Sequence, residues 1–276
     1  MATIGTDPEL LLVSAEDNGA FISSLGRFKG TKKAPVPMGL GTGYALQCDN
    51  VALEFNVPPA SDPAEFGNSI SAAMQYIRAL VSEQGLVVST SPEGFYEDAE
   101  LRHPLSKSFG CVPDLDAHAR CKASAVSPTV LKDDVREGGR WHLAGGHVHV
   151  GYTTHQSIPH FVAGAFADVF IGLPSIGRDT QERRRAHYGQ PGRYRVTPFG
   201  IEYRTLSGYW VHSEYQTGVV AKNALRLAAF LEGPQQKVRS LYASLPWADI
   251  RQAISSNDEA AAVLLRTYIG REMGNV

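Results

Sequence analysis

The amino-acid sequence predicts an α+β fold with a largely antiparallel sheet and flanking helices. Short segments of alternating apolar and polar residues are mixed with helical segments, without the regular strand–helix rhythm of a parallel sheet. The composition, 43% hydrophobic and 20% charged over 276 residues, is typical of a globular protein with a sizeable core. No repeat or low-complexity linker divides the chain. We therefore expect one domain over residues 1–276, with a helical C-terminal part at 213–276.

Strands are expected where side chains alternate or where a short apolar run is bounded by turn residues. Residues 51–57 (VALEFNV) alternate and then reach Pro58, which cannot donate a ladder hydrogen bond. Residues 9–13 (ELLLV) form a short apolar run that is typical of a buried strand. The predicted strands are residues 9–13, 51–57, 86–90, 146–152 and 200–207.

Helices are expected from apolar residues at helical spacing and from their flanking signals. Asp62 can cap a helix at 63–84, Pro63 suits its first turn, and Gly85 follows its end. Further helices are predicted at 157–172 and 213–232, and residues 246–272 are predicted to form one or two more.

Two stretches are expected to be irregular, residues 17–49 and residues 101–140. The first is rich in glycine and proline, and residues 26–43 within it are expected to close over a ligand. Its GTK sequence at 30–32 offers backbone N–H groups and Lys32 to an anion, with a solvated lysine as the alternative.

The charge balance and the cysteines exclude several classes of protein. A net charge of -2 disfavours direct nucleic-acid or membrane binding. The longest apolar stretch, 161–173, is too short to span a bilayer, and the N-terminal residues do not resemble a signal peptide. The chain has 3 cysteines and no CxxC spacing, which disfavours a zinc knuckle or a disulfide framework. We expect a reduced, cytoplasmic protein.

Four segments carry polar pairs at positions i and i+2, which point to the same face of a strand. Several carboxylates on one face repel each other unless cations lie between them, and oxygen-rich sites with few imidazoles suit Mg²⁺ or Mn²⁺. The alternatives are unrelated surface residues or, for the His pair, a transition-metal site of a hydrolase or oxygenase. The pairs are Asp7 with Glu9, Glu54 with Asn56, His147 with His149, and Glu202 with Arg204.

A second cluster is basic and lies just before the last predicted strand. Residues 183–195 read RRRAHYGQPGRYR, with arginines around a Gly-Pro turn. Arginine side chains match the oxygens of phosphates and carboxylates, so this run indicates a phosphate site beside the carboxylates. A solvated charge run is the alternative. The arginines are Arg183, Arg184, Arg185, Arg193 and Arg195.

Taken together, these segments resemble the phage-type amidoligases (phiEco32-like COOH–NH2 ligase type 2) of the glutamine synthetase-like carboxylate–amine ligase superfamily. The resemblance covers residues 4–212, although the first strand reads DPE where many relatives have ExE. It rests on the joint order of GTDPELLL, GTK, DNVALEFNVPPA, FGCVPD, GGHVHVGY, RRRAHYGQPGRYR and GIEYRTLSGYW.

The resemblance implies a curved, largely antiparallel sheet of glutamine synthetase-like type whose concave face holds ATP and Mg²⁺ or Mn²⁺. His147 is the implied metal ligand of its strand, and His149 is expected nearer the substrate. The implied metal ligands are Asp7, Glu9, Glu54, His147 and Glu202. The implied catalytic residues are His149, Arg193, Arg195 and Arg204. The implied cofactor-binding residues are Lys32, Arg184, Arg193, Arg195 and Arg204.

The resemblance implies an ATP-dependent carbon–nitrogen ligase that forms an amide through an acyl phosphate. Its partners are expected to be carboxylate and amine substrates, such as small molecules or peptides, and a homo-oligomer is compatible with this fold. For a phage-encoded protein the compartment is the host cytoplasm. A metal-dependent hydrolase or oxygenase that uses the His pair, and a non-catalytic nucleotide-binding protein, remain as alternatives.

Overall fold

The computed structural model describes residues 2–17, 19–107, 114–119, 121–122, 135–136, 138–180 and 182–274. The strands are β1 (Thr3–Thr6), β2 (Glu9–Leu10), β3 (Leu12–Ser14), β4 (Phe21–Ile22), β5 (Val36–Pro37), β6 (Ala45–Asp49), β7 (Ala52–Asn56), β8 (Leu86–Val88), β9 (Glu93–Glu97), β10 (Leu115–Asp116), β11 (Cys121–Lys122), β12 (Val135–Arg136), β13 (Gly139–Leu143), β14 (Val148–Gly151), β15 (Arg193–Thr197) and β16 (Gly200–Tyr203). The α-helices are α1 (Pro63–Ser82), α2 (His160–Ala167), α3 (Leu173–Ser175), α4 (Glu182–His187), α5 (Glu214–Glu232), α6 (Gln235–Ser244), α7 (Trp247–Ser255) and α8 (Glu259–Gly274).

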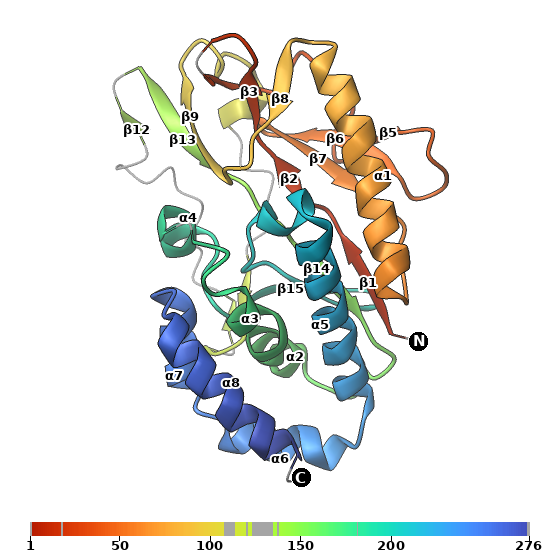
Figure 1. Cartoon of the computed structure of the whole chain (residues 1–276), viewed down its shortest axis with the longest axis vertical. Coiled ribbons are helices and arrows are strands. Elements are labelled where there is room, and N and C mark those ends of the chain that lie inside the picture. Colours follow the sequence, from red (N-terminus) through yellow and green to blue (C-terminus); the bar gives the residue numbers. More distant parts are fainter. Residues whose placement is uncertain are drawn as a thin grey trace.

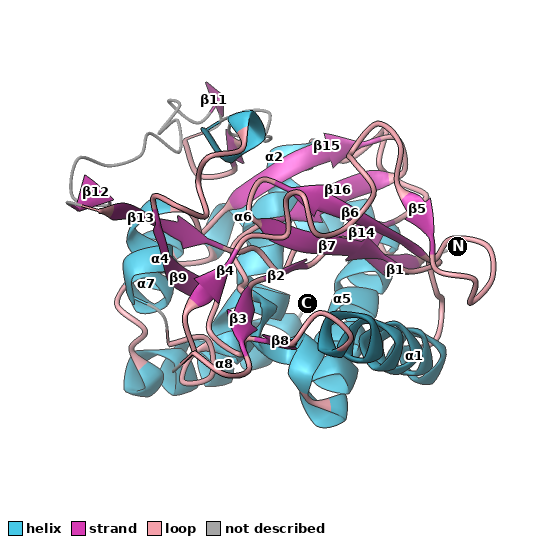
Figure 2. Cartoon of the chain, turned by 90° about the horizontal axis from the view of Figure 1, so that it is seen from above, coloured by secondary structure: helices cyan, strands magenta, loops and turns pink. Residues whose placement is uncertain are grey.

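The strands form several antiparallel sheets with helices packed against them, so the chain has a mixed α/β fold. The largest sheet has the order β1-β14-β16-β15-β10-β11, and a second has the order β2-β7-β6-β5. Figure 2 shows strands of both sheets in one layer above α1 and α5. In Figure 1 these two helices lie side by side, and α6, α7 and α8 gather at the opposite end of the molecule from β3 and β8. This arrangement confirms a mostly antiparallel α/β fold with flanking helices.

The strand register of the largest sheet separates an apolar face from a polar one. Val148 of β14 lies opposite Tyr203 of β16, and both are buried in the core that contains α2 and α5. The next residue pair, His149 and Glu202, points to the other face because side chains alternate along a strand. Arg195 of β15 is also paired with Glu202, so the imidazole, carboxylate and guanidinium share that face.

The helices at 63–84 and 213–232 are confirmed, and their caps explain why they begin where they do. The Asp62 carboxylate accepts hydrogen bonds from the N–H groups of Ala64 and Glu65 at the start of α1. Its apolar stripe packs inward, and Phe66 stacks on Trp210 with ring centroids 6.0 Å apart. The helix α5 begins after Ser213, which caps it in the same way. The stripe is made of the buried residues Ile70, Met74, Ile77 and Val81.

Other expectations for the secondary structure need correction. The predicted strand at 9–13 divides into β2 and β3, which belong to different sheets. The predicted helix at 157–172 is α2 followed by a π-helical turn, Asp168–Gly172. The expected loop at 17–49 contains β4, β5 and β6, since backbone pairing with β7 holds Ala45–Asp49 extended. Residues 246–272, which were expected to form one or two helices, form α7 and α8, whereas α6, which precedes them, was not predicted.

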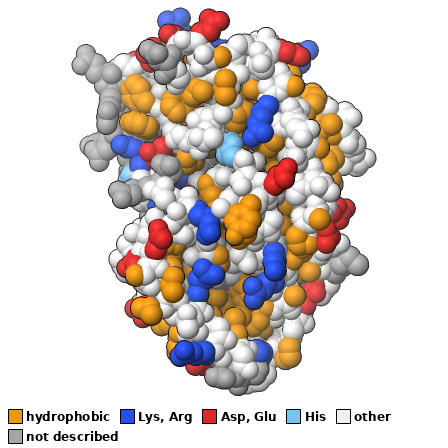
Figure 3. Space-filling model, viewed as in Figure 1, with side chains coloured by type: hydrophobic (Ala, Val, Ile, Leu, Met, Phe, Trp, Pro, Cys, Tyr) orange, Lys and Arg blue, Asp and Glu red, His pale blue; other side chains and the backbone are white. Residues whose placement is uncertain are grey.

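The visible surface agrees with the nearly balanced charge. On the face in Figure 3, basic, acidic and hydrophobic side chains are interspersed. None of the helices in the described ranges is long and apolar enough to cross a membrane.

Candidate functional site

A short connection, Asp7–Pro8–Glu9, carries the chain from the largest sheet into the second sheet. Asp7 follows β1, whereas Glu9 begins β2 and lies opposite Glu54 of β7. Proline has no N–H to donate to a ladder, so the chain can leave one sheet here without losing a hydrogen bond. The two acids therefore project from neighbouring sheets toward two groups of polar side chains.

The first acid cluster consists of Asp7, His149 and Glu202. One ligand atom from each of the three side chains lies within 4.8 Å of the other two. The His149 Nε2 is 3.1 Å from Asp7 Oδ1. The Glu202 side chain is buried. The cluster is therefore a candidate site for a divalent cation with two carboxylates and one imidazole.

The second acid cluster consists of Glu9, Asp49 and Glu54, all buried, whose ligand atoms also lie within 4.8 Å of one another. The N–H of Gly145 donates to Glu9 Oε2 at 2.6 Å. Lys32 lies beside the cluster, with its Nζ 2.5 Å from Asp49 Oδ2 and 3.8 Å from Glu54 Oε2. Lys32, which was expected to bind an anionic ligand, thus supplies positive charge to the carboxylates.

The electrostatics of the two clusters differ. In the second cluster, burial and the neighbouring carboxylates of Asp7, Glu9 and Asp49 hold the pKa of Glu54 well above its ordinary value. Burial also raises the pKa of Glu9. In the first cluster, burial opposes ionisation of Asp7, but the two histidines outweigh it and lower the pKa of Asp7. The second cluster is therefore the one that lacks sufficient positive charge.

Both histidines of the predicted pair lie at the first acid cluster, where they contact different partners. His149, expected nearer the substrate, is the imidazole of the first acid cluster. His147, expected to bind metal, directs its Nε2 to the Tyr188 hydroxyl at 2.8 Å. Its Nδ1 lies 3.3 Å from both Asp7 Oδ1 and Glu202 Oε1. His147 therefore connects the first cluster to Tyr188.

Arg204 and Arg195 lie against the first acid cluster. Arg204 is fully buried, and its Nη1 donates to Glu202 Oε1 while its Nη2 donates to the Tyr188 hydroxyl at 2.7 Å. Arg195 Nη1 is 3.6 Å from Glu202 Oε2. Burial opposes ionisation of Glu202, but the charges of His147 and Arg204 outweigh it and lower its pKa. These guanidinium groups place positive charge next to a carboxylate that stays ionised.

Arg193 and Arg184 were also expected to contact phosphate. Arg193 is two residues from Arg195 on β15, and its Nε donates to Gln190 Oε1 at 3.1 Å. Arg184 is 1% exposed and donates to main-chain carbonyls: its Nε to Ala144 at 2.6 Å and its Nη1 to Thr205 at 2.7 Å. The structure does not support Arg184 as a phosphate ligand, because its guanidinium holds the chain that leads out of β16.

Gly146, just before the His-containing strand, permits the close approach of another segment of the chain. A Cβ at Gly146 would lie 2.2 Å from the carbonyl oxygen of Ser207. The backbone of residues 206–208 therefore passes directly against this strand, and Gly146 N–H donates to Leu206 O at 2.9 Å.

Three residues near the clusters were not singled out from the sequence. Asp49 lies two residues after Gln47, the same spacing as in the other polar pairs. Both residues, however, belong to the stretch 17–49 that was expected to be irregular. Tyr188 stands inside the basic run. Asp114 is the last residue of the FGCVPD segment, and the other residues of that segment, 109–113, lie outside the described residues. The Oδ1 atom of Asp114 is 2.5 Å from Arg204 Nε. Only the folded chain brings Asp114 and Tyr188 to Arg204.

The fold and the site together define a mixed α/β protein with two carboxylate clusters, the first flanked by arginines and the second by Lys32. Residues 139–260 match the model of the family described as phage phiEco32-like COOH.NH2 ligase-type 2. This match confirms the amidoligase resemblance over the segment with His147, His149 and Glu202, and the family name describes a carboxylate–amine ligase. No match was found among curated proteins.

Proposed function

We propose that this protein is an ATP-dependent carboxylate–amine ligase that forms an amide through an acyl phosphate. The observation that carries the proposal is the pair of acid clusters, Asp7/His149/Glu202 and Glu9/Asp49/Glu54, with Arg195 and Arg204 beside the first. Paired divalent-cation sites next to guanidinium groups suit phosphoryl transfer, because both neutralise charge on the transferred group. The match to a carboxylate–amine ligase family supports the same reaction class.

The donor sets of both clusters fit divalent cations. The second cluster offers three buried carboxylates, and burial together with the neighbouring carboxylates raises the pKa of Glu54. Carboxylate oxygens are the preferred ligands of Mg²⁺ and Mn²⁺. Bound cations would supply Lewis-acid neutralisation of the ATP phosphates. Glu9, Asp49 and Glu54 would hold one cation, and Asp7, His149 and Glu202 another.

The chain's own cationic groups complete this charge balance. Arg195 and Arg204 would stabilise the oxygens of the phosphoryl group as it moves from ATP to the substrate carboxylate. Arg204 is held by Glu202, Tyr188 and Asp114, so its guanidinium is positioned before substrate binds. Lys32 would turn from Asp49 toward a phosphate once a cation occupies the second cluster.

The proposed reaction has two steps. A carboxylate oxygen of the acid substrate forms a bond to the γ-phosphorus, and the bond from that phosphorus to ADP breaks. The amine nitrogen then attacks the acyl carbon, and phosphate leaves as the amide forms and a proton is released. Residues 26–43 are proposed to exclude water during these steps, because an exposed acyl phosphate hydrolyses.

We also propose that the fold is of the glutamine synthetase-like type. Two antiparallel sheets joined by the Asp7–Pro8–Glu9 connection carry carboxylates on a shared face, which supports that architecture. A metal-dependent hydrolase with both imidazoles on one ion is less well supported, because the clustered ligand atoms include His149 but not His147, whose Nε2 faces Tyr188.

The test is acceptor-dependent turnover. Purified protein with ATP, Mg²⁺ and a panel of acid–amine pairs is expected to release ADP and phosphate only when both substrates are present. Glu202→Gln is expected to lower this rate by about a hundredfold or more, since it removes a carboxylate that would hold a divalent cation and that positions Arg204. Glu83→Gln, a matched change at an exposed residue, is expected to have no effect.

Full turnover by Glu202→Gln would refute the assignment of this site. Binding of ATP without turnover for any acid–amine pair would favour a non-catalytic nucleotide-binding protein. A single bound transition metal with hydrolysis independent of ATP would favour the hydrolase or oxygenase.

A further inference from the structure

Asp114 contacts two arginines of the proposed phosphoryl-transfer site and belongs to neither acid cluster. Its Oδ1 is 2.5 Å from Arg204 Nε and 4.0 Å from Arg195 Nε. A carboxylate on the Nε of an arginine restricts the rotation of the planar guanidinium. The orientation of Arg204 therefore depends on where Asp114 lies.

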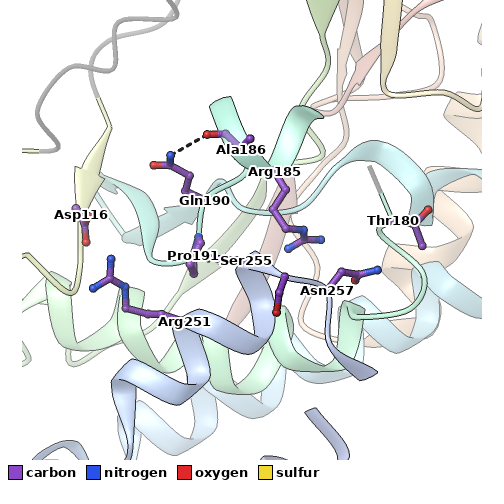
Figure 4. Close-up of a pocket in the computed structure, with 10 residues that line it drawn as sticks. Asp116, Thr180, Arg185, Ala186, Gln190, Pro191, Arg251, Ser255 and Asn257 are labelled. Carbon is purple, nitrogen blue, oxygen red and sulfur yellow. Dashed lines mark hydrogen bonds between the residues drawn. The ribbon is translucent and has the colours of Figure 1, made fainter. Parts of the chain in front are cut away.

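Asp114 stands directly before β10, which is much shorter than most strands. Its two residues, Leu115 and Asp116, pair with β15, whereas strands usually have about 5–6 residues. Asp116 also lines a cavity of about 480 Å³ together with Gln190 and Pro191 of the turn before β15 (Figure 4). Side chains thus leave space between β10 and this turn, so the short ladder needs a further anchor to hold Asp114 in place.

A buried contact between His118 and Asp168 supplies this anchor. His118 lies two residues after β10, and its Nε2 is 2.7 Å from Asp168 Oδ2. The two side chains are 5% and 0% exposed, so water does not compete for this contact. Asp168 Oδ1 accepts hydrogen bonds from the Gly192 N–H at 2.9 Å and from the Tyr203 hydroxyl at 2.6 Å. One carboxylate therefore joins the segment after β10 to the start of β15 and to β16.

The backbone at Gly192 leaves room for the His118 ring. Gly192 has a φ of +73°, a conformation that favours glycine. A Cβ at Gly192 would lie 2.5 Å from His118 Cδ2, so a larger residue there would displace the imidazole. The Gly192 carbonyl oxygen also accepts a hydrogen bond from the Ala117 N–H at 3.0 Å. The turn thus contacts both the His118 ring and the neighbouring backbone.

We propose that His118, held by Asp168, is a positioning residue for Arg204: it fixes the end of β10 and so keeps Asp114 against the guanidinium. A buried ionisable pair adds little stability compared with apolar packing, because both groups lose their hydration. A directional contact instead fixes the geometry of the segments that it joins, and a displacement of about 1 Å at a reacting site can cost about a hundredfold in rate. The inference rests on the proposed function, since Arg204 acts on the phosphoryl group only in that reaction.

The first measurement does not depend on turnover. The Nε–Hε signal of Arg204 is followed by NMR in the full chain labelled with ¹⁵N-arginine, and Asp114→Ala gives the position of this signal without the carboxylate. We expect His118→Leu to move the signal toward that position. His118→Gln should retain most of the original position, because the amide nitrogen of glutamine can take the place of Nε2. His103→Leu, the same change at an exposed histidine, should not move the signal.

The second measurement is acceptor-dependent turnover with ATP in the same variants. We expect His118→Leu to lower kcat about tenfold, because Arg204 is then less well oriented. It should have no further effect in a chain that already carries Asp114→Ala, because both changes act through one contact. If His118→Leu does not fold, the double variant with Asp168→Asn, which also removes the buried charge, takes its place in both measurements.

The outcomes separate the two proposals. An unmoved Arg204 signal in His118→Leu, an equal shift in His118→Gln, or rate losses that multiply when combined with Asp114→Ala would each overturn the positioning role. A shifted signal in His118→Leu, without turnover by the unmodified protein for any acid–amine pair, would refute the ligase function but support the positioning of Arg204 by His118.

Discussion

Replacement of Arg184 by Met separates a structural role of this arginine from a role in phosphate binding. Its guanidinium donates to the carbonyl oxygens of Ala144, Thr205 and Leu206, the first two at 2.6 and 2.7 Å. Hydrogen bonds from a charged donor contribute about 1.5 kcal/mol each at the lower end of the measured range. Three such bonds give about 4.5 kcal/mol. Burying the charged guanidinium costs free energy, as its lowered pKa indicates, and this cost reduces the sum.

We therefore expect Arg184→Met to lower the free energy of unfolding by about 3–5 kcal/mol. Urea unfolding followed by circular dichroism measures this change as a lower midpoint. Domains of this kind are stable by only about 5–15 kcal/mol, so the loss would be plain.

Arg183→Met is the matched control at the neighbouring position. The Arg183 guanidinium lies 4.6 Å from the centre of the Trp141 ring, a contact worth about 1 kcal/mol or less. The structural role of Arg184 would be refuted if Arg184→Met unfolded within about 1 kcal/mol of the unmodified protein but lost affinity for ATP. That result would restore the phosphate role expected from the basic run.

Three further predictions concern the two acid clusters. The pKa of Glu54 is raised well above its ordinary value of 4.5, so just above pH 4.5 the folded state holds a proton that the unfolded state has lost. Without metal, the stability should therefore fall as pH rises from 4.5 to the raised pKa. Thermal unfolding at several pH values, with a chelator to remove metal, measures this effect. Glu54→Gln is expected to show a smaller fall in stability with rising pH than the unmodified protein. Tyr188→Phe removes the hydroxyl between His147 and Arg204 and should cost about 1–2 kcal/mol in urea unfolding. Asp49→Asn should raise the Mg²⁺ concentration for half-maximal thermal stabilisation by about tenfold.

Exposed residues provide matched controls for these changes. Glu83→Gln should retain the pH dependence, Tyr268→Phe should unfold like the unmodified protein, and Asp17→Asn should keep the Mg²⁺ response. An unchanged pH profile in Glu54→Gln, no loss of stability in Tyr188→Phe, or an unaltered Mg²⁺ response in Asp49→Asn would contradict the respective assignment.

Local features of the chain could be predicted where neighbouring residues alone determine them. The Asp62 cap and the apolar spacing from Ile70 to Val81 specify α1, since a helix is built from contacts three and four residues apart. Strand alternation likewise placed His147 with His149, and Glu202 with Arg204, on the same face of their strands. The register then pairs His149 with Glu202. The π-helical turn at Asp168 was not predicted, and Asp168 Oδ1 there accepts hydrogen bonds from two distant partners, Tyr203 and Gly192.

Pairing between distant segments decided the parts of the site that the sequence pattern missed. Ala45–Asp49 is a strand because β7 pairs with it, and that pairing brings Asp49 to Glu9 and Glu54. Arg184 and Arg185 are neighbours in one basic run, yet one binds main-chain carbonyls and the other lines a separate cavity. Successive residues of a helix point in different directions, and only packing determines what each one meets.

The sequence by itself determined the antiparallel α/β character of this protein and the residue types of its acid and arginine groups. These follow from periodicity and composition, which are properties of short segments. The tertiary structure decided that the carboxylates divide into two clusters, that His149 joins the first, and that Lys32 lies beside the second. Such choices depend on contacts between residues far apart in the chain, whose energies become available only when the sheets are assembled.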